Sequence, residues 1–238
     1  MQSVLIKVKW DVNQAVDFYY ANDVQRQIVM EVAKRPGGGS WNKSKAEATF
    51  NSYKAKSGDV MDEDGIVNFY KAIGVDMETD IVSLMFSFHM QVKDKQMCMG
   101  EYTKAEFLKG AENLACDEIS TWKAKVPDMR NDLNNEQKFK EMYKFVFGFA
   151  CEKGFKSVEI ESACALWPML IGNRCKFLDK WIKFIEGKAE KKEITVMTRD
   201  TWDLFLDLTV QTKGQWSNFE DDGAWPVLID QFNEYMSA

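Results

Sequence analysis

The sequence predicts an all-α protein, and three observations lead to that prediction. Apolar residues recur at helical spacing in long segments such as Phe139–Ala150 and Lys176–Ile185. The stretches Ser44–Glu47 and Thr103–Glu106 read SKAE and TKAE, which match the capping box at the start of a helix. Strict alternation of apolar and polar residues, the pattern of a half-buried strand, is scarce along the chain.

Four segments carry the clearest helical signals. Ile81–Met90 is apolar enough for a buried helix, and Phe139–Ala150 is apolar on nearly all sides, as expected of a central helix. Lys176–Ile185 and Arg199–Leu208 each place large apolar side chains at helical spacing. All four are therefore expected to contribute to the core.

A connector near the N-terminus divides the chain. Lys34–Ser44 reads KRPGGGSWNKS, and a proline followed by three glycines interrupts any helix. The sequence thus predicts an N-terminal segment of residues 1–34, a Gly-rich linker of residues 35–45 and a domain of residues 46–238.

Composition limits the kinds of function. Of the 238 residues 45% are hydrophobic, including 8 Trp and 16 Phe, which is ample for a large core. The net charge of −6 argues against nucleic-acid binding and favours a basic protein partner. The cysteines are odd in number and never spaced C-x-x-C, and no segment of about eighteen residues is uncharged and apolar. We expect no membrane span and a reducing compartment, the cytosol or the nucleus.

The sequence offers few residues for catalysis. His89 is the single histidine, and its apolar neighbours favour a partly buried helix residue over a catalytic base. No Cys/His cluster has the spacing of a zinc site. Gly37–Gly39 lacks the lysine and hydroxyl residue that complete a phosphate loop. The sequence predicts no catalytic residue, no metal and no cofactor.

The stretch Gly58–Phe69, GDVMDEDGIVNF, has the outline of a calcium loop. With Gly65 as its sixth position, the first ligand position falls on Val60 and the twelfth on Lys71, and neither supplies a carboxylate. In a second near-match, Cys98–Gly100 occupy positions that would need oxygen ligands. The two segments are expected to pair their helices as EF-hands do, without calcium.

Five longer motifs point to one family. They are DGIVNF (64–69), EYTKAEFLKGAENLACDEI (101–119), NRCKFLDKWIKFI (173–185), RDTWDLFLDL (199–208) and DDGAWPVLIDQF (221–232). These motifs resemble the defective-in-cullin-neddylation (Dcn-like) family, from about Ala46 to the C-terminus. The resemblance implies a PONY domain, which is an all-helical fold of two EF-hand-like halves without calcium.

The resemblance implies a noncatalytic co-ligase. Members of the family hold a cullin and a ubiquitin-like conjugating enzyme together, so that the Nedd modifier passes to a cullin lysine while the cullin's RING partner assists. Such a protein accelerates the reaction by positioning the reactants. The absence of a nucleophile motif from the sequence agrees with that role.

The resemblance also implies two binding sites. Asp200, Ala224 and Asp230 match the acidic patch that binds the winged-helix subdomain of the cullin, where a small alanine allows close approach and the carboxylates receive Lys or Arg. Taken alone, Asp200 suits the first turn of a helix and Asp230 a solvated helix face. The second site is an apolar pocket for the acetylated N-terminal methionine of the conjugating enzyme. The positions that match its lining are Ile66, Ser83, Phe86, Tyr102, Phe149, Leu166 and Met169.

The segment Trp10–Asn22 resembles the last helix of a ubiquitin-associated domain. The first two helices of that three-helix unit have no counterpart in this sequence, and one helix cannot bury its own apolar face. We expect a remnant that does not bind ubiquitin.

Two other functions stay open on the residues alone. Asp62 and Asp64 support an EF-hand-like calcium sensor, which Val60 and Lys71 oppose. A cysteine-dependent transferase needs a reactive thiol. The candidates are Cys98, Cys116, Cys151, Cys164 and Cys175.

Overall fold

The computed structural model describes residues 41–56, 58–91, 97–220 and 225–237. From Lys43 onward they belong to one unit of the chain. The predicted remnant helix Trp10–Asn22, the segment 1–34 and most of the linker 35–45 lie outside the described residues, so these boundaries stay predictions.

Helices make up most of the described residues, and the all-α prediction is confirmed. The four segments with the clearest helical signals correspond to α6, α9, α11 and α12. In chain order the elements are α4 (Lys43–Tyr53), β1 (Val60–Met61), α5 (Glu63–Ile73), α6 (Val82–His89), β2 (Tyr102–Thr103), α7 (Lys104–Leu114), α8 (Ile119–Asp132), α9 (Glu136–Ala150), α10 (Ile160–Ile171), α11 (Leu178–Glu190), α12 (Arg199–Gln211), the 3-10 helix η1 (Trp216–Asn218) and α13 (Val227–Ser237).

Two short strands join two helix–strand–helix units, α4–β1–α5 and α6–β2–α7. The strands are antiparallel, with Val60 opposite Thr103 and Met61 opposite Tyr102. The two units thus pair through the segments that the sequence predicted to pair. Their likeness to EF-hands in detail stays a prediction.

Gly65 has a different role from the one that the calcium-loop interpretation gives it. It lies in the first turn of α5, where its amide donates a hydrogen bond to Asp62 Oδ1 at 3.0 Å, so Asp62 caps the helix. The loop residue with left-handed backbone is Gly58, with φ of 95°. A Cβ on Gly65 would lie 2.1 Å from the carbonyl oxygen of Tyr53. Glycine is therefore required where the end of α4 meets α5.

One of the two predicted capping boxes is confirmed. At the start of α7, Thr103 N donates to Glu106 Oε2 at 2.7 Å and Glu106 N donates to Thr103 Oγ1 at 3.4 Å. The other is displaced, because α4 already begins at Lys43 and Ser44 lies inside its first turn.

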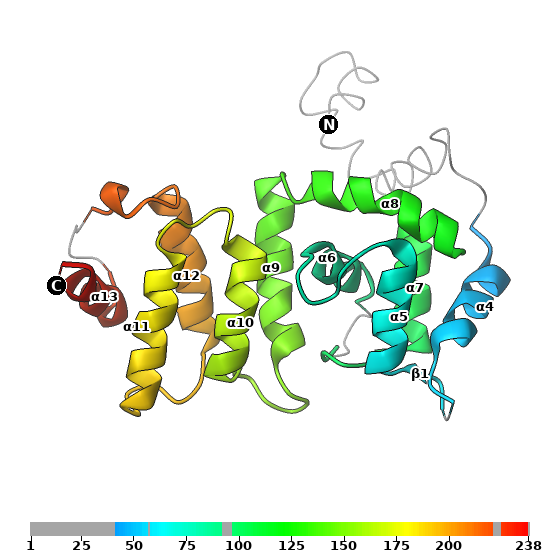
Figure 1. The fold of residues 1–238 in the computed structure, drawn as a ribbon, viewed down its shortest axis with the longest axis horizontal. Coiled ribbons are helices and arrows are strands. Elements are labelled where there is room, and N and C mark those ends of the chain that lie inside the picture. The colour runs from blue at the N-terminus through cyan, green and yellow to red at the C-terminus, as the bar shows by residue number, and fades with distance from the viewer. Residues whose placement is uncertain (1–40, 57, 92–96, 221–224, 238) are drawn as a thin grey trace, which may run out of the picture. The chain divides into compact units, whose positions relative to one another are not determined.

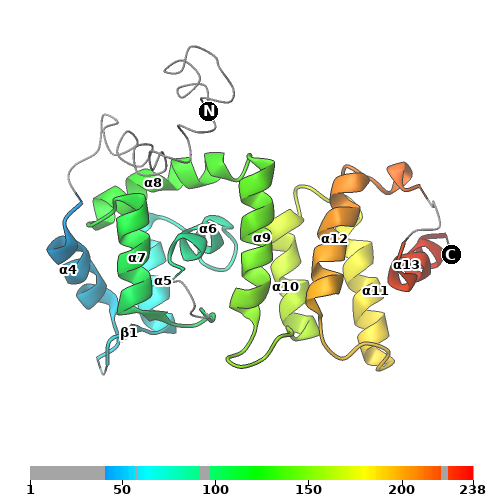
Figure 2. The same cartoon turned by 180° about the vertical axis from the view of Figure 1, so that it is seen from behind.

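The helix α9 lies between two groups of helices (Figures 1 and 2). Helices α4 to α8 pack on one another in the first group, and α10 to α13 form the second, in which α10 and α13 both pack on α11. Helix α9 contacts α6 on one side and α10 and α12 on the other. As the sequence predicted, α9 is the central helix of the unit.

Aromatic rings fill the core of the first group. The ring centroid of Phe69 lies 5.3 Å from that of Phe107 and 5.4 Å from that of Trp122, and Phe86 lies 5.4 Å from Trp122. All four side chains are fully buried. Edge-to-face pairs of this kind add about 0.5–1.5 kcal/mol each beyond the burial of their area. They fix α5, α6, α7 and α8 against one another.

The second group has its own aromatic core. The rings of Trp181 and Phe205 stack with centroids 4.4 Å apart, and Phe232 lies 5.1 Å from Trp181 in an edge-to-face contact. These three rings come from α11, α12 and α13, so one cluster joins the last three helices.

Two helical glycines give a matched test of this packing. Gly65→Ala should lower the free energy of unfolding by about 1–3 kcal/mol, because the new methyl group meets a backbone carbonyl that cannot move cheaply. Gly148→Ala, in α9, should raise it by about 0.5–1 kcal/mol, because the nearest atom to its Cβ is 3.6 Å away and alanine is the better helix former. Urea denaturation followed by circular dichroism measures both changes. An equal change in the free energy of unfolding for the two substitutions would contradict the close approach of α4 to α5 at Gly65.

Candidate functional site

The two predicted cullin-binding aspartates that the structure describes are exposed first-turn residues of different helices. Asp200 follows Thr198, the N-cap of α12, whose hydroxyl accepts from Thr201 N at 3.2 Å. Asp230 lies in the first turn of α13. Ala224 lies outside the described residues. Helix α12 packs on α9, and α13 packs on α11.

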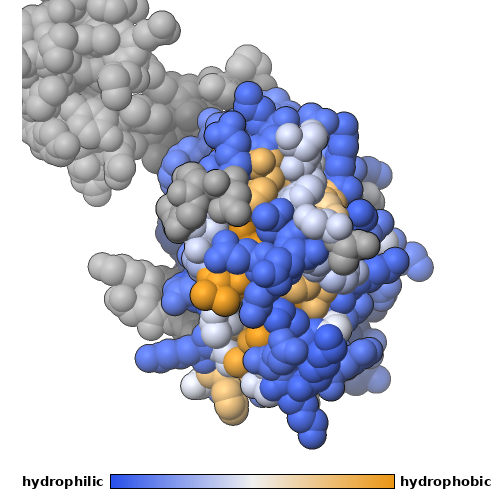
Figure 3. Space-filling model, turned by 90° about the vertical axis from the view of Figure 1, so that its left-hand side faces the viewer, coloured by the Kyte–Doolittle hydropathy of each residue, from blue (hydrophilic) through white to orange (hydrophobic). Residues whose placement is uncertain are grey.

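Phe232 anchors α13 and leaves Asp230 in solvent. Its ring is fully buried, with its centroid 4.9 Å from that of Trp216. In the same first turn as Asp230, the side chain of Val227 is 69% exposed. Figure 3 shows this end of the unit as a mainly hydrophilic surface with small apolar areas between. Mixed surfaces of this type are common in protein–protein interfaces.

Tyr143 fixes the start of α12 against α9 and α10. Its hydroxyl accepts from Trp167 Nε1 at 3.0 Å and donates to the carbonyl oxygen of Trp202 at 3.0 Å. Trp202 Nε1 in turn donates to the carbonyl oxygen of Tyr143 at 3.2 Å. Burial raises the pKa of Tyr143 well above its usual value, so the hydroxyl stays protonated and can donate.

Six of the seven predicted pocket residues are buried, and Met169 is half-buried. They come from α5, α6, β2, α9 and α10, on both sides of the boundary between the two helix groups. The buried six are Ile66, Ser83, Phe86, Tyr102, Phe149 and Leu166.

Two of these residues belong to a buried hydroxyl cluster. Tyr102 Oη lies 2.6 Å from Ser87 Oγ and 3.0 Å from Tyr70 Oη, and Tyr70 Oη lies 2.9 Å from the carbonyl oxygen of Ser83. The Ser83 hydroxyl donates away from the cluster, to the carbonyl oxygen of Asp80 at 2.9 Å. Burial raises the pKa of both tyrosines, so all the hydroxyls are neutral. Ser83 and Tyr102 therefore bond within the protein.

Phe149, one of the predicted pocket residues, lines a cavity. A pocket of about 230 Å³ lies where the end of α6 and the start of α12 meet α9. Its apolar side is formed by Phe149, Phe145 and Met97. Lys144 and Arg199 also line it, and sequence reasoning missed both. For Lys144 the sequence did offer a signal, because this residue lies in the same apolar helical segment as Phe149.

A larger, open pocket lies beside the first loop, with a volume of about 670 Å³. It is lined by Lys54, Asp62 and Asp64 among others. In the part of the chain that the structure describes, no three His, Cys, Asp or Glu residues are grouped closely enough to hold a metal ion.

The buried cysteines are poor nucleophiles. Burial raises the pKa of Cys116 to about 12 and those of Cys164 and Cys175 to about 11, and it also raises the pKa of Cys151. Nucleophilic attack requires the thiolate, which these thiols do not form at neutral pH.

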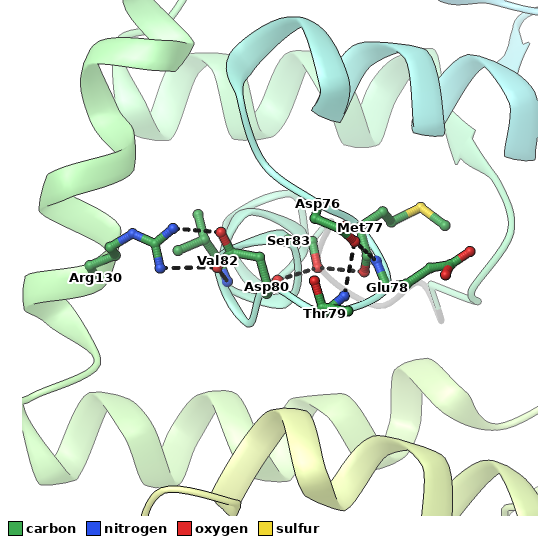
Figure 4. A network of polar contacts seen from close by, with 8 residues as sticks. All are labelled: Asp76, Met77, Glu78, Thr79, Asp80, Val82, Ser83 and Arg130. Atoms are coloured by element: carbon green, nitrogen blue, oxygen red, sulfur yellow. Dashed lines mark hydrogen bonds and ion pairs between the residues drawn. The ribbon is translucent and has the colours of Figure 1, made fainter.

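A polar network fixes the start of α6, the helix that carries Ser83 and Phe86 (Figure 4). Asp80 Oδ1 accepts from Val82 N at 3.1 Å, and the Asp80 carboxylate receives both terminal nitrogens of Arg130 on α8, at 3.1 and 2.5 Å. Paired N–H···O bonds of this kind restrict orientation as well as distance. The network therefore sets the position of α6 relative to α8.

Comparisons with known proteins agree on one family. A family model described as cullin binding matches residues 121–235. DCN1-like protein 5 of Rattus norvegicus is 30% identical over 200 residues, which cover 84% of this chain and 80% of the relative. Defective in cullin neddylation protein 1 of Caenorhabditis elegans is 27% identical over 253 residues, which cover 97% and 82%. This chain belongs to the DCN1-like family.

Membership in the DCN1-like family supports a role in cullin neddylation. The matched residues 121–235 run from the start of α8 to near the end of α13 and include both described aspartates. None of the helices in the described ranges is long and apolar enough to span a membrane.

The Asp80 network gives a test of what orders α6. Asp80→Ala should lower the free energy of unfolding by about 1–3 kcal/mol, because it removes both the acceptor for Val82 N at the start of α6 and the carboxylate of the ion pair. Arg130→Ala should lower the free energy of unfolding by about 1 kcal/mol or less, because its side chain is 54% exposed and the hydrogen bond from Val82 N to Asp80 is retained. Urea midpoints compare the two variants. An equal loss in both would show that the ion pair, and not the hydrogen bond from Val82 N to Asp80, carries the stabilisation.

Proposed function

We propose that this chain is a noncatalytic co-ligase of cullin neddylation. It binds the winged-helix subdomain of a cullin through Asp200, Ala224 and Asp230, and the acetylated N-terminus of the conjugating enzyme through the apolar pocket at Phe149. The cullin's RING partner takes part in the same assembly. The observation that supports this proposal most is the match of the cullin-binding family to residues 121–235.

The exposed aspartates suit a basic partner. Both lie in the first turn of a helix. Both side chains are exposed, so a partner can reach them. Lys and Arg side chains of a cullin are the complementary groups, and such pairs increase association rate and specificity.

Two observations favour the adaptor over the alternatives. The raised pKa values of the buried thiols weigh against a cysteine-dependent transferase. Asp62, one of the two carboxylates that suggested a calcium sensor, caps α5. An adaptor needs neither a thiolate nor an ion, because holding two reactants together raises their effective concentration.

Reconstituted cullin modification tests the proposal. The reaction contains cullin, its RING partner and conjugating enzyme loaded with the modifier. Adding this protein should increase the rate of cullin modification at least roughly tenfold. Asp230→Lys should remove the acceleration, because charge reversal places like charges against the cullin. Asp179→Lys is the matched control, since Asp179 is also an exposed first-turn aspartate, on α11. No acceleration by the wild-type protein would refute the proposed function.

The N-terminal acetyl group gives a separate test of the pocket. A peptide that begins with acetyl-Met should bind at least roughly tenfold more tightly than the same peptide with a free amine. The free amine must lose its hydration to enter an apolar cavity without a partner, which costs several kcal/mol. Fluorescence anisotropy with the two labelled peptides measures the ratio. Equal affinities would exclude Phe149 and its neighbours as an acetyl-methionine pocket.

A further inference from the structure

Two loops meet at the end of the second helix group where α12 begins. Residues 151–159 connect α9 to α10, and residues 191–198 connect α11 to α12 (Figures 1 and 2). Val158 N donates to the carbonyl oxygen of Met197 at 3.0 Å, and Met197 N donates to that of Val158 at 2.7 Å. This pair of backbone bonds holds the first loop against the residue before Thr198, the N-cap of α12.

The paired side chains are buried, whereas apolar side chains close to them in the sequence are exposed. Val158 and Met197 are each 1% exposed, but Val196 is 43% and Phe155 61% exposed. Successive side chains of an extended segment point to opposite sides, so Val196 points away from the side on which Met197 is buried. The amide of Phe155 donates to the carbonyl oxygen of Glu152 at 3.0 Å, which closes a turn. Hydrogen-bonded backbone therefore presents both apolar side chains to solvent.

Phe155 differs from the other phenylalanines. In the parts of the chain that the structure describes, every other phenylalanine is buried or half-buried. A single exposed apolar residue is common on protein surfaces. Here, however, Phe155 and Val196 lie on two bridged loops, and the exposed Asp200 follows Met197 by three residues, in the first turn of α12. The apolar pair is thus continuous with one of the two described aspartates of the proposed cullin site.

Carboxylates alone make a weak interface. Exposed ion pairs contribute little to affinity, because solvent and salt screen them. Most of the affinity of an interface comes from a few large side chains that lose contact with water at its centre, with charged groups around them. Asp200 and Asp230 supply charge but no apolar area. Phe155 and Val196 supply apolar area beside Asp200.

We propose that Phe155 and Val196 form an apolar contact with the cullin winged-helix subdomain beside Asp200. The occupant is an apolar side chain of that subdomain that neighbours the Lys or Arg directed at Asp200. The loop of residues 151–159 carries two Lys and two Glu, so it has no net charge that would repel a basic partner. This inference rests on the proposed function, because it adds residues to the same cullin site.

Calorimetric titration of the cullin winged-helix subdomain into variants of this protein tests the contact. Phe155→Ala should weaken binding roughly fivefold to thirtyfold, the effect of truncating a central interface residue. Val196→Thr keeps the shape of the side chain but adds a hydroxyl, and it should weaken binding roughly threefold to tenfold. Val210→Ala is the matched control, because Val210 is 65% exposed near the other end of α12, and it should bind like the wild-type protein. Urea midpoints should stay unchanged in all three variants, because the substituted side chains are exposed.

Salt separates an apolar contact from an effect of charge. The loss of affinity caused by Asp200→Asn should shrink when the salt concentration rises to about 0.5 M, because the screening length becomes short. The loss caused by Phe155→Ala should be the same at low and high salt. The acetyl-Met peptide should bind Phe155→Ala as tightly as wild-type protein, because the described lining of the pocket at Phe149 does not include Phe155.

The outcomes distinguish this inference from the proposed function. Wild-type affinity of Phe155→Ala and Val196→Thr, together with loss of binding in Asp230→Lys, would overturn the apolar contact and leave the proposed cullin site in place. An equal loss in Val210→Ala, or a loss in Phe155→Ala that vanishes at high salt, would also overturn the contact. Failure of the wild-type protein to bind the subdomain would overturn both proposals.

Discussion

The hydrogen bonds of Tyr143 hold together the three helices on which the C-terminal half depends. A single buried hydroxyl accepts from Trp167 on α10 and donates to the backbone of Trp202 on α12, and the two rings of Tyr143 and Trp202 stack 4.8 Å apart. Inside a protein such bonds are costly to leave unmade, so the three helices have one favourable register. Arg199 and Asp200 lie within a turn of Trp202 on α12. Their position relative to α9 is therefore set by this contact.

That register brings the two proposed binding surfaces together at the start of α12. Arg199 faces α9 and lines the pocket with Phe149, whereas the next residue, Asp200, is exposed. Asp230 reaches solvent from α13, whose Phe232 packs on Trp181 of α11. We infer that a bound cullin and a bound peptide become neighbours near the first turn of α12.

The sequence predicted the helical class, the central place of α9 and the residues of the confirmed capping box, because these depend on local periodicity and on spacings of three or four residues. It did not predict that Gly65 is needed beneath the carbonyl of Tyr53, because that contact depends on how two helices approach each other. Ser83 and Tyr102 match a pocket lining in the sequence, and the sequence did not show that their hydroxyls form hydrogen bonds within the protein. The hydrogen bond from Arg199 to the carbonyl oxygen of Lys144 joins residues 55 positions apart, and nothing in the local sequence marks such a pair. A single sequence does not specify how helices that are far apart along the chain approach one another.

The proposed co-ligase role requires that both partners are bound at once. The most direct measurement is therefore titration of the cullin winged-helix subdomain into this protein, first alone and then saturated with an acetyl-Met peptide, by isothermal calorimetry. We expect the subdomain to bind in both titrations with affinities within roughly threefold of each other, and a ternary complex to form. Loss of subdomain binding in the presence of the peptide would show that the two ligands compete, and would contradict a role in holding them together.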